Sequence, residues 1–497
     1  MQDDIQRLQE ENRVLQEANQ LLREENQILR EEQAMLQALV AELLPLKEQV
    51  ASLSSQVKQL ESRLAKDSHN SHLPPSSDRF GHRAKSLRKK SGKKPGAQPG
   101  HEGTTLFLSP TPDLVVVHEV HTCESCQADL SQQEVAQIQR RQVLDVPAKR
   151  LLVWEHQVQV KWCPHCSRVT SASFPQGVEA PVQYGPALGA IAIYLVQQQL
   201  LPYERACETL QDLIGPAMTV GTLKALVERC ASHLQPMEEQ IAATLREGKV
   251  MHQDETSLSV LGKRYWMHVA STAHLTHYAV HASRGRKALD ASGLLKGFAG
   301  VSVHDGLASY QGYDCLHALC NVHLLRDLTF VEEVMNAPWA TEMKALLLDM
   351  KQAVQEARTA GRTSLSAEQL DTFHTRYHHL LLTAHTQLPT ETQTGPPKKG
   401  RKKQSPERNL LDRLVKYEEQ VLRFLYDFDV PFDNNQAERD IRMVKVLQKV
   451  SGGFRSLPGA QAFCRIRGYL STLRKQRLPL ITALEQALTG HPLSPAL

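Results

Sequence analysis

Residues 430–446 read VPFDNNQAERDIRMVKV, and this stretch decides how the rest of the chain is interpreted. Asp433 and Asn434 stand where a helix begins, and both residue types are good caps of helix N-termini. Glu438 follows one turn inside a helix that is otherwise strongly basic, with Arg439 directly after it. Capping does not explain this glutamate, so its role depends on other carboxylates that the fold brings close to it.

Two other acids stand in apolar or strand-forming segments, where an unpaired charge is costly. Asp254 lies in KVMHQDETSLSV, and Asp305 ends GFAGVSVHD. Three strands in a meander, a helical segment, a further strand and a late helix form the order of an RNase H-like core, in which the first and fourth strands are neighbours. That order predicts that Asp254, Asp305 and Glu438 form one catalytic site. Taken singly, Asp254 could instead cap a turn, and Asp305 could begin a loop.

Three carboxylates at one place favour hard divalent cations, because Mg²⁺ and Mn²⁺ prefer oxygen ligands. Two Mg²⁺ ions held by Asp254, Asp305 and Glu438 can activate an attacking water or 3′-hydroxyl and stabilise the leaving oxygen of a phosphodiester. Neighbouring acids are expected to point elsewhere, Glu255 by strand alternation and Asp440 by its place on the helix.

The first 66 residues predict a coiled coil. Leucine recurs at every seventh position, and the core positions between the leucines include Asn12, Asn19 and Asn26, which is the pattern of a parallel two-stranded zipper. The repeating leucines are Leu8, Leu15, Leu22, Leu29, Leu36 and Leu43. Pro45 is expected to interrupt the helix. The zipper predicts a homo-oligomer, and the alternative is one long helix packed on the globular part of the same chain.

Residues 67–103 are rich in Ser, Pro, Gly and Lys and are predicted to be a basic disordered linker. Further runs of positive charge follow at 398–403 and 439–477, although the net charge is only +4. One such run is ordinarily a solvated linker, but three in one chain favour a polyanion such as double-stranded DNA. The candidate DNA contacts are Lys89, Lys90, Lys224, Arg439, Arg442, Lys445, Lys449, Arg455 and Arg467.

Two C-x-x-C pairs within residues 104–178 predict a small zinc-binding β domain. Cys123 with Cys126 and Cys163 with Cys166 supply four thiolates, the ligand set of a structural Zn²⁺ site. A redox C-x-x-C normally occurs once and opens a helix. The chain has nine cysteines, which in a reducing compartment do not indicate a disulfide framework.

The remaining segments complete a multidomain α+β organisation. Residues 179–246 predict a helical DNA-binding domain with a helix-turn-helix whose second helix is capped by Thr219. Two packed helices without DNA contact would give the same pattern. Residues 247–480 predict the RNase H-like α/β catalytic domain, with a helical insertion at about 333–428, and residues 481–497 predict a C-terminal tail.

Cys320 and His323 belong to a C-x-H-x-x-C-x-x-H stretch that begins with Cys315 and His317. These soft ligands at short spacing leave a second zinc site open, although packing and support of the active site by Cys320 and His323 is the default interpretation. No uninterrupted apolar run reaches membrane-spanning length, so we expect a bacterial cytoplasmic protein that is associated with the nucleoid when bound to DNA and has no membrane partner.

Four stretches together resemble the ordered signatures of the insertion sequence 66 family of bacterial transposases. They are HQDETS, VHDGLASYQGY, CNVHLLRDL and FDNNQAERDIRMVKV. The resemblance covers nearly the whole chain and implies a DDE catalytic triad of Asp254, Asp305 and Glu438. It also implies cleavage at transposon ends, transfer of the 3′ ends into a target, and possible accessory proteins of the same element. One departure is LQKVSGGFRS after the last motif, where Lys449 and Arg455 replace the family's frequent Arg-Lys-Asn run.

Two rival functions remain open at this stage. A zinc-containing DNA-binding regulator with an inert RNase H-like domain would share the zipper, the cysteine pairs and the basic runs. The complete set of three acids favours an enzyme, because a binding protein has no need of it. A nuclease without strand transfer would keep the acids and would differ only in failing to join the cut 3′ ends to a second DNA.

Overall fold

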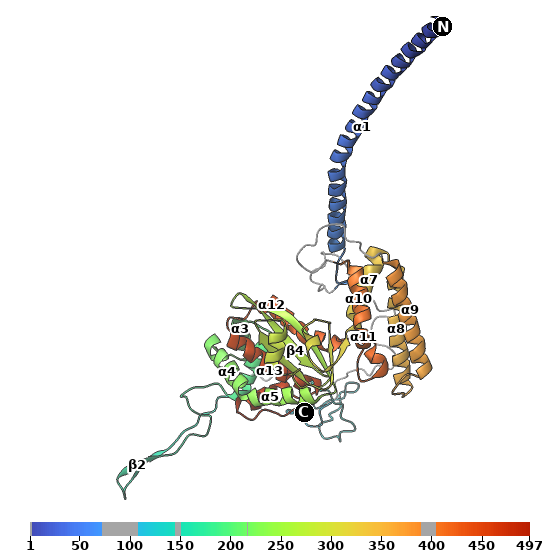
Figure 1. The fold of residues 1–497 in the computed structure, drawn as a ribbon. Helices are drawn as coiled ribbons and strands as arrows, with labels where there is room; N and C mark the ends of the chain where they lie inside the picture. Colours follow the sequence, from blue (N-terminus) through green and yellow to red (C-terminus); the bar gives the residue numbers. More distant parts are fainter. Residues whose placement is uncertain (1, 72–107, 145–150, 216, 389–403) are drawn as a thin grey trace. The chain divides into compact units, whose positions relative to one another are not determined.

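The computed structural model describes most of the chain in atomic detail (Figure 1). The described residues are 2–71, 108–144, 151–215, 217–388 and 404–497. Lys89 and Lys90 and nearly all of the predicted basic linker lie outside these residues.

The chain divides into two compact units, which we call the helical unit and the sheet unit. The helical unit consists of Met1–Leu87, Asn321–Glu356 and Leu365–Glu418. The sheet unit consists of Arg88–Cys320, Ala357–Ser364 and Glu419–Leu497. Most of the helical insertion predicted at about 333–428 lies in the helical unit.

The helical unit contains the long N-terminal helix and the helices that follow the sheet. Its helices are α1 (Gln2–Leu64), α7 (Asn321–Met335), α8 (Pro338–Thr359), α9 (Ala367–Gln387) and α10 (Pro406–Lys416), with α11 (Glu418–Tyr426) starting at its last residue. The insertion has its own buried residues, among them Trp339, whose indole nitrogen donates to Glu407 Oε1 at 2.7 Å.

Helix α1 is 63 residues long and continues through Pro45. The predicted interruption is therefore wrong, because a helix can bend and keep its course where proline removes one hydrogen bond, and Figure 1 shows α1 as one curved helix. The six repeating leucines are all more than half exposed. These leucine side chains are therefore accessible in the described chain. A coiled coil requires such accessible leucines to pack against a second helix.

The sheet unit is built around a mixed sheet whose strands run in the order β5-β4-β3-β6-β7. The strands are β3 (Val250–Val260), β4 (Lys263–Ser271), β5 (Thr276–His281), β6 (Val301–His304) and β7 (Leu316–Leu319). Strands β3, β4 and β5 form an antiparallel meander, and β6 and β7 continue the sheet parallel to β3. Leu261 and Gly262 both have positive φ in the turn between β3 and β4, as a tight hairpin requires.

Each face of the sheet is covered by different helices. On one face, Leu258 and Val260 of β3 pack with Ala437, Ile441 and Val444 of α12 (Asn435–Ser451). On the other face, Met251 and Ala270 pack with Leu289 of α6 (Arg286–Ser292) and with Leu294 and Leu295 after it. Because side chains alternate along a strand, even-numbered residues of β3 face α12 and odd-numbered residues face α6.

Residues 179–246 do not form a separate domain. They contain α2 (Pro186–Ile193), a π-helical turn (Tyr194–Gln198), α3 (Tyr203–Ile214), α4 (Val220–His233) and α5 (Gln235–Glu247). These helices share one hydrophobic core with α13 (Leu457–Lys475), α14 (Leu480–Leu488) and part of the sheet. The predicted cap is confirmed, since Thr219 Oγ1 accepts a hydrogen bond from Thr222 N at 3.2 Å.

The predicted C-terminal tail, residues 481–497, is an integral part of this core. Ala483, Leu484, Ala487 and Leu488 are buried, and α14 packs against α2 and α4. The part of the predicted tail that lies in α14 therefore packs in the core, because these four residues form an apolar stripe at helical spacing. Among the described residues, no helix is long and apolar enough to cross a membrane.

The cysteine-pair segment, which comprises residues 108–144 and 151–178, has little regular structure. Its hairpin consists of β1 (Val160–Cys163) and β2 (Arg168–Ser171), paired antiparallel. Large apolar side chains such as Val117, Val153 and Trp154 are at least 74% exposed. Local turns, rather than a hydrophobic core, therefore define the described part of this segment.

Candidate active site

The two predicted aspartates lie at the same level on adjacent parallel strands. The paired register of β3 and β6 ends with His252 opposite Val303, and Asp254 and Asp305 each follow two residues later. Neighbouring strands lie about 4.8 Å apart, so the two carboxylates emerge next to each other on the α12 face. Gly306 has a φ of 94°, which lets the chain turn away directly after Asp305.

Glu438 approaches the same place from the first turn of α12. Burial raises the pKa of Asp254 well above its ordinary value, and the negative charges of Glu255, Asp305 and Glu438 raise it further, while a hydrogen bond from the Glu255 backbone N–H opposes the rise. Asp254 thus lies within electrostatic reach of Asp305 and of Glu438. Among the described residues, the three carboxylates are not one of the groups of potential ligands whose atoms lie within 4.8 Å of one another, so a shared metal site stays a prediction. Such a cluster of carboxylates has the donor chemistry of a site for divalent cations.

Asn434 ties the start of α12 to β3 beside Asp254. Its side-chain Nδ2 donates to Gln253 O at 2.7 Å, and its Oδ1 lies 2.9 Å from His252 Nδ1. Its backbone N donates to Cys320 Sγ at 3.2 Å. Asn434 stands at the N-cap position but makes no side-chain capping bond. Its predicted role as a cap is therefore wrong, since the fully buried amide is used to attach the helix to the sheet.

The Cys320 thiol lies close to the Glu438 carboxylate. Its Sγ is 3.9 Å from Glu438 Oε1, so its position fits the predicted support of the active site. Cys315 and His317 are used differently: His317 Nδ1 lies 3.1 Å from His304 Nε2, and Cys315 Sγ lies 3.9 Å from His317 Nε2. His323 lies in the first turn of α7, in the helical unit.

The opposite face of β3 carries an ion pair between buried Glu255 and exposed Arg284, which was not expected from the sequence. Glu255 Oε1 accepts from Arg284 Nε at 2.9 Å and Nη2 at 2.7 Å, and Glu255 Oε2 accepts from Tyr310 OH at 2.9 Å. Arg284 Nη2 is also 3.9 Å from Asp305 Oδ2. Arg284 therefore links the two faces at the end of the strands. Arg284 belongs to none of the sequence motifs. Its pairing with Glu255 is visible only in the folded sheet.

His304 lies next to this ion pair, in contact with Tyr310. Its ring stacks on Tyr310 with centroids 4.5 Å apart. Burial, aided by the neighbouring His317, lowers the pKa of His304 to about 3, so its imidazole is neutral at ordinary pH. Burial also raises the pKa of Glu255, and Asp305 raises it further, while Arg284 and Tyr310 oppose the shift.

The rival acids point away from Asp254. Asp433 Oδ1 accepts from Asn435 N at 3.1 Å, consistent with its predicted role at the helix start. Asp440 Oδ2 pairs with Lys475 Nζ at 2.8 Å, and neither acid contributes to the pKa of Asp254. Asp433 and Asp440 are thus each engaged by other groups, and the assignment of Glu438 rather than these acids to the site stays a prediction.

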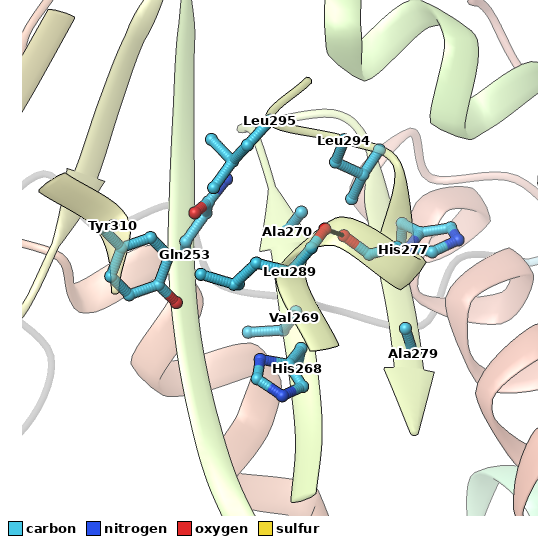
Figure 2. A pocket seen from close by; sticks show the side chains of 11 residues that line it. Gln253, His268, Val269, Ala270, His277, Ala279, Leu289, Leu294, Leu295 and Tyr310 are labelled. Atoms are coloured by element: carbon cyan, nitrogen blue, oxygen red, sulfur yellow. Dashed lines mark hydrogen bonds between the residues drawn. The ribbon is translucent and has the colours of Figure 1, made fainter. Parts of the chain in front are cut away.

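A pocket on the α6 face of the sheet is not a substrate site. Figure 2 shows Gln253 and Tyr310 beside Leu289, with His268 and His277 further along the sheet. Its cavity volume of about 20 Å³ fits a single water but no nucleotide. Asp254 lies on the other face of β3, since side chains alternate along a strand.

Most of the predicted DNA contacts that the structure describes are exposed cations. Arg439, Arg442, Lys449 and Arg455 are exposed on or just after α12. Two further exposed lysines make contacts with their own chain: Lys224 Nζ lies 2.9 Å from Glu228 Oε1, and Lys445 Nζ donates to Ser257 O at 2.8 Å.

Arg467 does not fit the role predicted for it. It is 7% exposed, and its Nη1 donates to the backbone oxygens of Gln197 and Gln198 and to the side-chain oxygen of Gln198. The Arg467 guanidinium binds the carbonyl oxygens at the end of a π-helical turn inside the protein. It is therefore not accessible to a DNA phosphate. We therefore remove Arg467 from the candidate DNA contacts.

The two cysteine pairs adopt the same local turn. Gln127 N donates to Cys123 O and Ser167 N donates to Cys163 O, both at 2.9 Å, and both donor residues have positive φ. The pKa of Cys123 and of Cys163 is lowered, first of all by the backbone N–H of Cys126 and of Cys166 respectively. Each pair thus presents two thiols on one side of a turn, as a zinc knuckle requires.

Within the described part of the chain, the four sulfurs are not among the groups of potential ligands that lie within 4.8 Å of one another. A single ion shared by Cys123, Cys126, Cys163 and Cys166 therefore stays a prediction.

The comparison with protein families agrees with this geometry. The family described as transposase IS66 matches residues 181–462, more than half of the chain, including all three acids. A family of unknown function, DUF6444, matches residues 9–106, which hold most of the N-terminal helix and the basic linker. No curated protein matches the chain. The chain therefore belongs to the IS66 family of transposases.

Proposed function

We propose that this protein is a DDE-type DNA transposase that binds the terminal repeats of its element, cleaves there and transfers the 3′ ends to target DNA. One observation carries the proposal: the β3–β6 register sets Asp254 beside Asp305, and the first turn of α12 adds Glu438. The strand order β5-β4-β3-β6-β7, with a meander followed by two parallel strands, supports an RNase H-like core.

Asp254, Asp305 and Glu438 are proposed as the ligands of two Mg²⁺ ions, with Mn²⁺ as a substitute. When bound, the metal pair supplies activation of the attacking water or 3′-hydroxyl and stabilisation of the leaving oxygen. The chain's own groups determine where the carboxylates stand. Asn434 sets the position of Glu438 relative to Asp254, and Arg284 holds Glu255 away from the metal side.

The DNA contacts are proposed along the exposed side of α12. Arg439 and Arg442 follow Glu438 directly, and Lys449 and Arg455 continue the positive charge past the end of the helix. Lys445 lies between them, with its Nζ on the backbone of β3. Each cation that meets a phosphate releases a counterion. Phosphates bound here would bring a scissile bond close to the carboxylates, and Lys89, Lys90 and Lys224 are proposed as further contacts.

Self-association and zinc complete the proposal. The exposed leucine stripe of α1 supports a homo-oligomer through a zipper, and pairing of this kind would allow two transposon ends to be handled together. Structural Zn²⁺ on the two cysteine pairs would order the segment that precedes the core. We place the protein in the bacterial cytoplasm, with accessory proteins of the same element as possible partners.

The direct experiment incubates the purified chain and Mg²⁺ with labelled terminal-repeat DNA and an unlabelled target. We expect the wild type to nick the 3′ ends and to join them to the target. Glu438→Gln and Asp254→Asn should each reduce nicking by at least about 100-fold, since each removes a metal ligand. Asp433→Asn is the matched control, because it alters an acid on the same helix start but leaves the site intact.

The outcomes separate the rival functions. Nicking without joining would indicate a nuclease, and binding without nicking by the wild type would indicate a regulator. Nicking that is unchanged in Glu438→Gln would refute the assignment of the site. Loss of folding is a weak explanation for inactivity of Asp254→Asn, because its neutral amide replaces a carboxylate whose charge is disfavoured by burial.

A further inference from the structure

The helical unit brings together two histidines and a glutamate that belong to none of the motifs used above. His374 and His378 are four positions apart on α9, and Glu418 is the first residue of α11. Glu418 Oε1 lies 2.7 Å from His378 Nε2 and 3.6 Å from His374 Nδ1. All three residues lie in the helical unit, and their potential ligand atoms lie within 4.8 Å of one another.

These separations are close to those that a metal ion imposes. Zinc binds imidazole nitrogens and carboxylate oxygens at about 2.0–2.2 Å in tetrahedral geometry, which places neighbouring ligand atoms about 3.3–3.6 Å apart. Histidines at i and i+4 share one helix face, the arrangement by which a helix offers two nitrogens to one ion. The two contacts of Glu418 Oε1, 2.7 Å to His378 Nε2 and 3.6 Å to His374 Nδ1, bracket this spacing.

The backbone beneath the three side chains is firmly held. Tyr377, which lies between the histidines in sequence, is fully buried and donates its hydroxyl to Leu414 O at 3.1 Å. Leu380 and Leu381 of α9 and Leu411 of α10 are buried as well. The positions from which the ligands project are therefore set by packing, and an ion would not have to organise the backbone.

The charges around the cluster leave the carboxylate available. The nearest arginine on α9, Arg376, pairs with Asp349 at 3.2 Å. The side chain of Glu418 is 26% exposed, and that of His378 is 56% exposed. A cation can thus enter from solvent and retain a water as its fourth ligand.

We propose that His374, His378 and Glu418 form a binding site for a transition-metal dication of the Zn²⁺, Co²⁺ or Ni²⁺ class. Two imidazole nitrogens and one carboxylate select these ions over Mg²⁺, which prefers oxygen ligands. The bound ion links α9 to the first residue of α11, and α10 lies in the chain segment between these two points. This inference is independent of the proposed transposase activity and of the cysteine pairs.

The test uses Co²⁺ as the probe and the full chain, first stripped of metal with a chelator. Cobalt bound by thiolates gives a sulfur-to-metal charge-transfer band, whereas cobalt on nitrogen and oxygen ligands gives only d–d absorption, so the two kinds of site are read separately. We expect the double variant His374→Ala/His378→Ala to lose about one equivalent of tightly bound Co²⁺ without change in the charge-transfer band. Glu418→Gln should weaken the same site at least about tenfold.

The matched control is His379→Ala/His385→Ala, which removes two exposed histidines of the same helix outside the cluster. It should retain the full equivalent. As a second measurement, Zn²⁺ should raise the thermal unfolding temperature of a chain with both cysteine pairs changed to Ser, and this rise should vanish on adding His374→Ala/His378→Ala. Equal Co²⁺ binding by the wild type and the double variant would overturn the proposal and leave a hydrogen-bonded His–carboxylate pair only.

Discussion

The acid cluster and the cysteine-pair segment are both predicted metal sites, but they are built in opposite ways. The acids come from residues far apart in sequence, and strand register and helix packing bring Asp254 and Glu438 together. The cysteines make their turns locally, within five residues each, while apolar side chains such as Trp154 stay exposed. The predicted site of the acids therefore depends on the packing of the sheet and α12, whereas each cysteine pair depends only on its own local turn.

The largest test of this contrast is Asn434→Ala. Removing the buried amide leaves Gln253 O and His252 without their partner and should cost about 1–3 kcal/mol of stability. The displaced α12 should also lower the rate of 3′-end nicking by about 10–100-fold, since misplaced catalytic groups are costly. Nicking rates and hydrogen exchange of β3 measure the two effects. Asn435→Ala, at the neighbouring exposed position, should behave like the wild type, and equal rates in both variants would deny Asn434 its role.

The second test concerns the cysteine-pair segment. Cys126→Ser should remove about one equivalent of thiolate-bound metal, because three thiolates hold Zn²⁺ much less tightly than four. The unfolding temperature of the sheet unit should stay nearly unchanged, since its core contains none of these four cysteines. Metal analysis and calorimetry provide the measurements, with Cys207→Ser as control. A large fall in the unfolding temperature would show that the two regions are not energetically separate.

A third test uses the pH dependence of the sheet. Burial lowers the pKa of His268 to about 4, although a hydrogen bond to the Ser283 backbone opposes this shift. The ordinary value of histidine in an unfolded chain is about 6.5. The contribution of neutral His268 to stability is therefore complete above pH 6.5 and is lost as the pH falls from there towards 4.

At pH 5 this loss should amount to about 2 kcal/mol relative to pH 7. Hydrogen exchange of β4 amides at both pH values measures it, and His268→Gln should remove that part of the pH dependence. The exposed turn around Cys126 should show no matching change. The same pH dependence in the variant and the wild type would assign the effect to other buried histidines, such as His277.

The smallest expected effect belongs to single cations on α12. Arg442→Ala should weaken DNA binding modestly and reduce the slope of log affinity against log salt concentration by about 0.9, the value for one lost phosphate contact. Binding titrations at several salt concentrations provide the slope. Arg246, an exposed arginine at the end of α5, is the control. An unchanged slope for Arg442→Ala would place the DNA elsewhere on the sheet unit.

Several features of the fold and site could be read from sequence because they depend on local rules. Strand alternation correctly separated Asp254 from Glu255, and helix geometry separated Glu438 from Asp440. The cap at Thr219 followed from its residue type and the start of a buried stripe. Such rules act over a few residues, so no knowledge of distant partners was needed.

Other features depended on partners that no local rule specifies. Arg467 lies in a basic run, yet its guanidinium is buried against the carbonyls of Gln197 and Gln198. Arg284 lies in no motif, yet it pairs with Glu255. Pro45 predicted a break that α1 does not show, because a single missing hydrogen bond is a small loss in a helix of 63 residues.

The sequence by itself determined the family, the acids and the residue types that make turns and zippers, because these are properties of spacing and side-chain chemistry. Only the tertiary structure decided which of the many charged residues meet. Asn434 shows the difference: its sequence position indicates a cap, but packing of α12 on β3 makes it the link between Glu438 and Asp254. Burial raises the energy of every unpaired polar group, so the fold, rather than the motif, assigns each of them a partner.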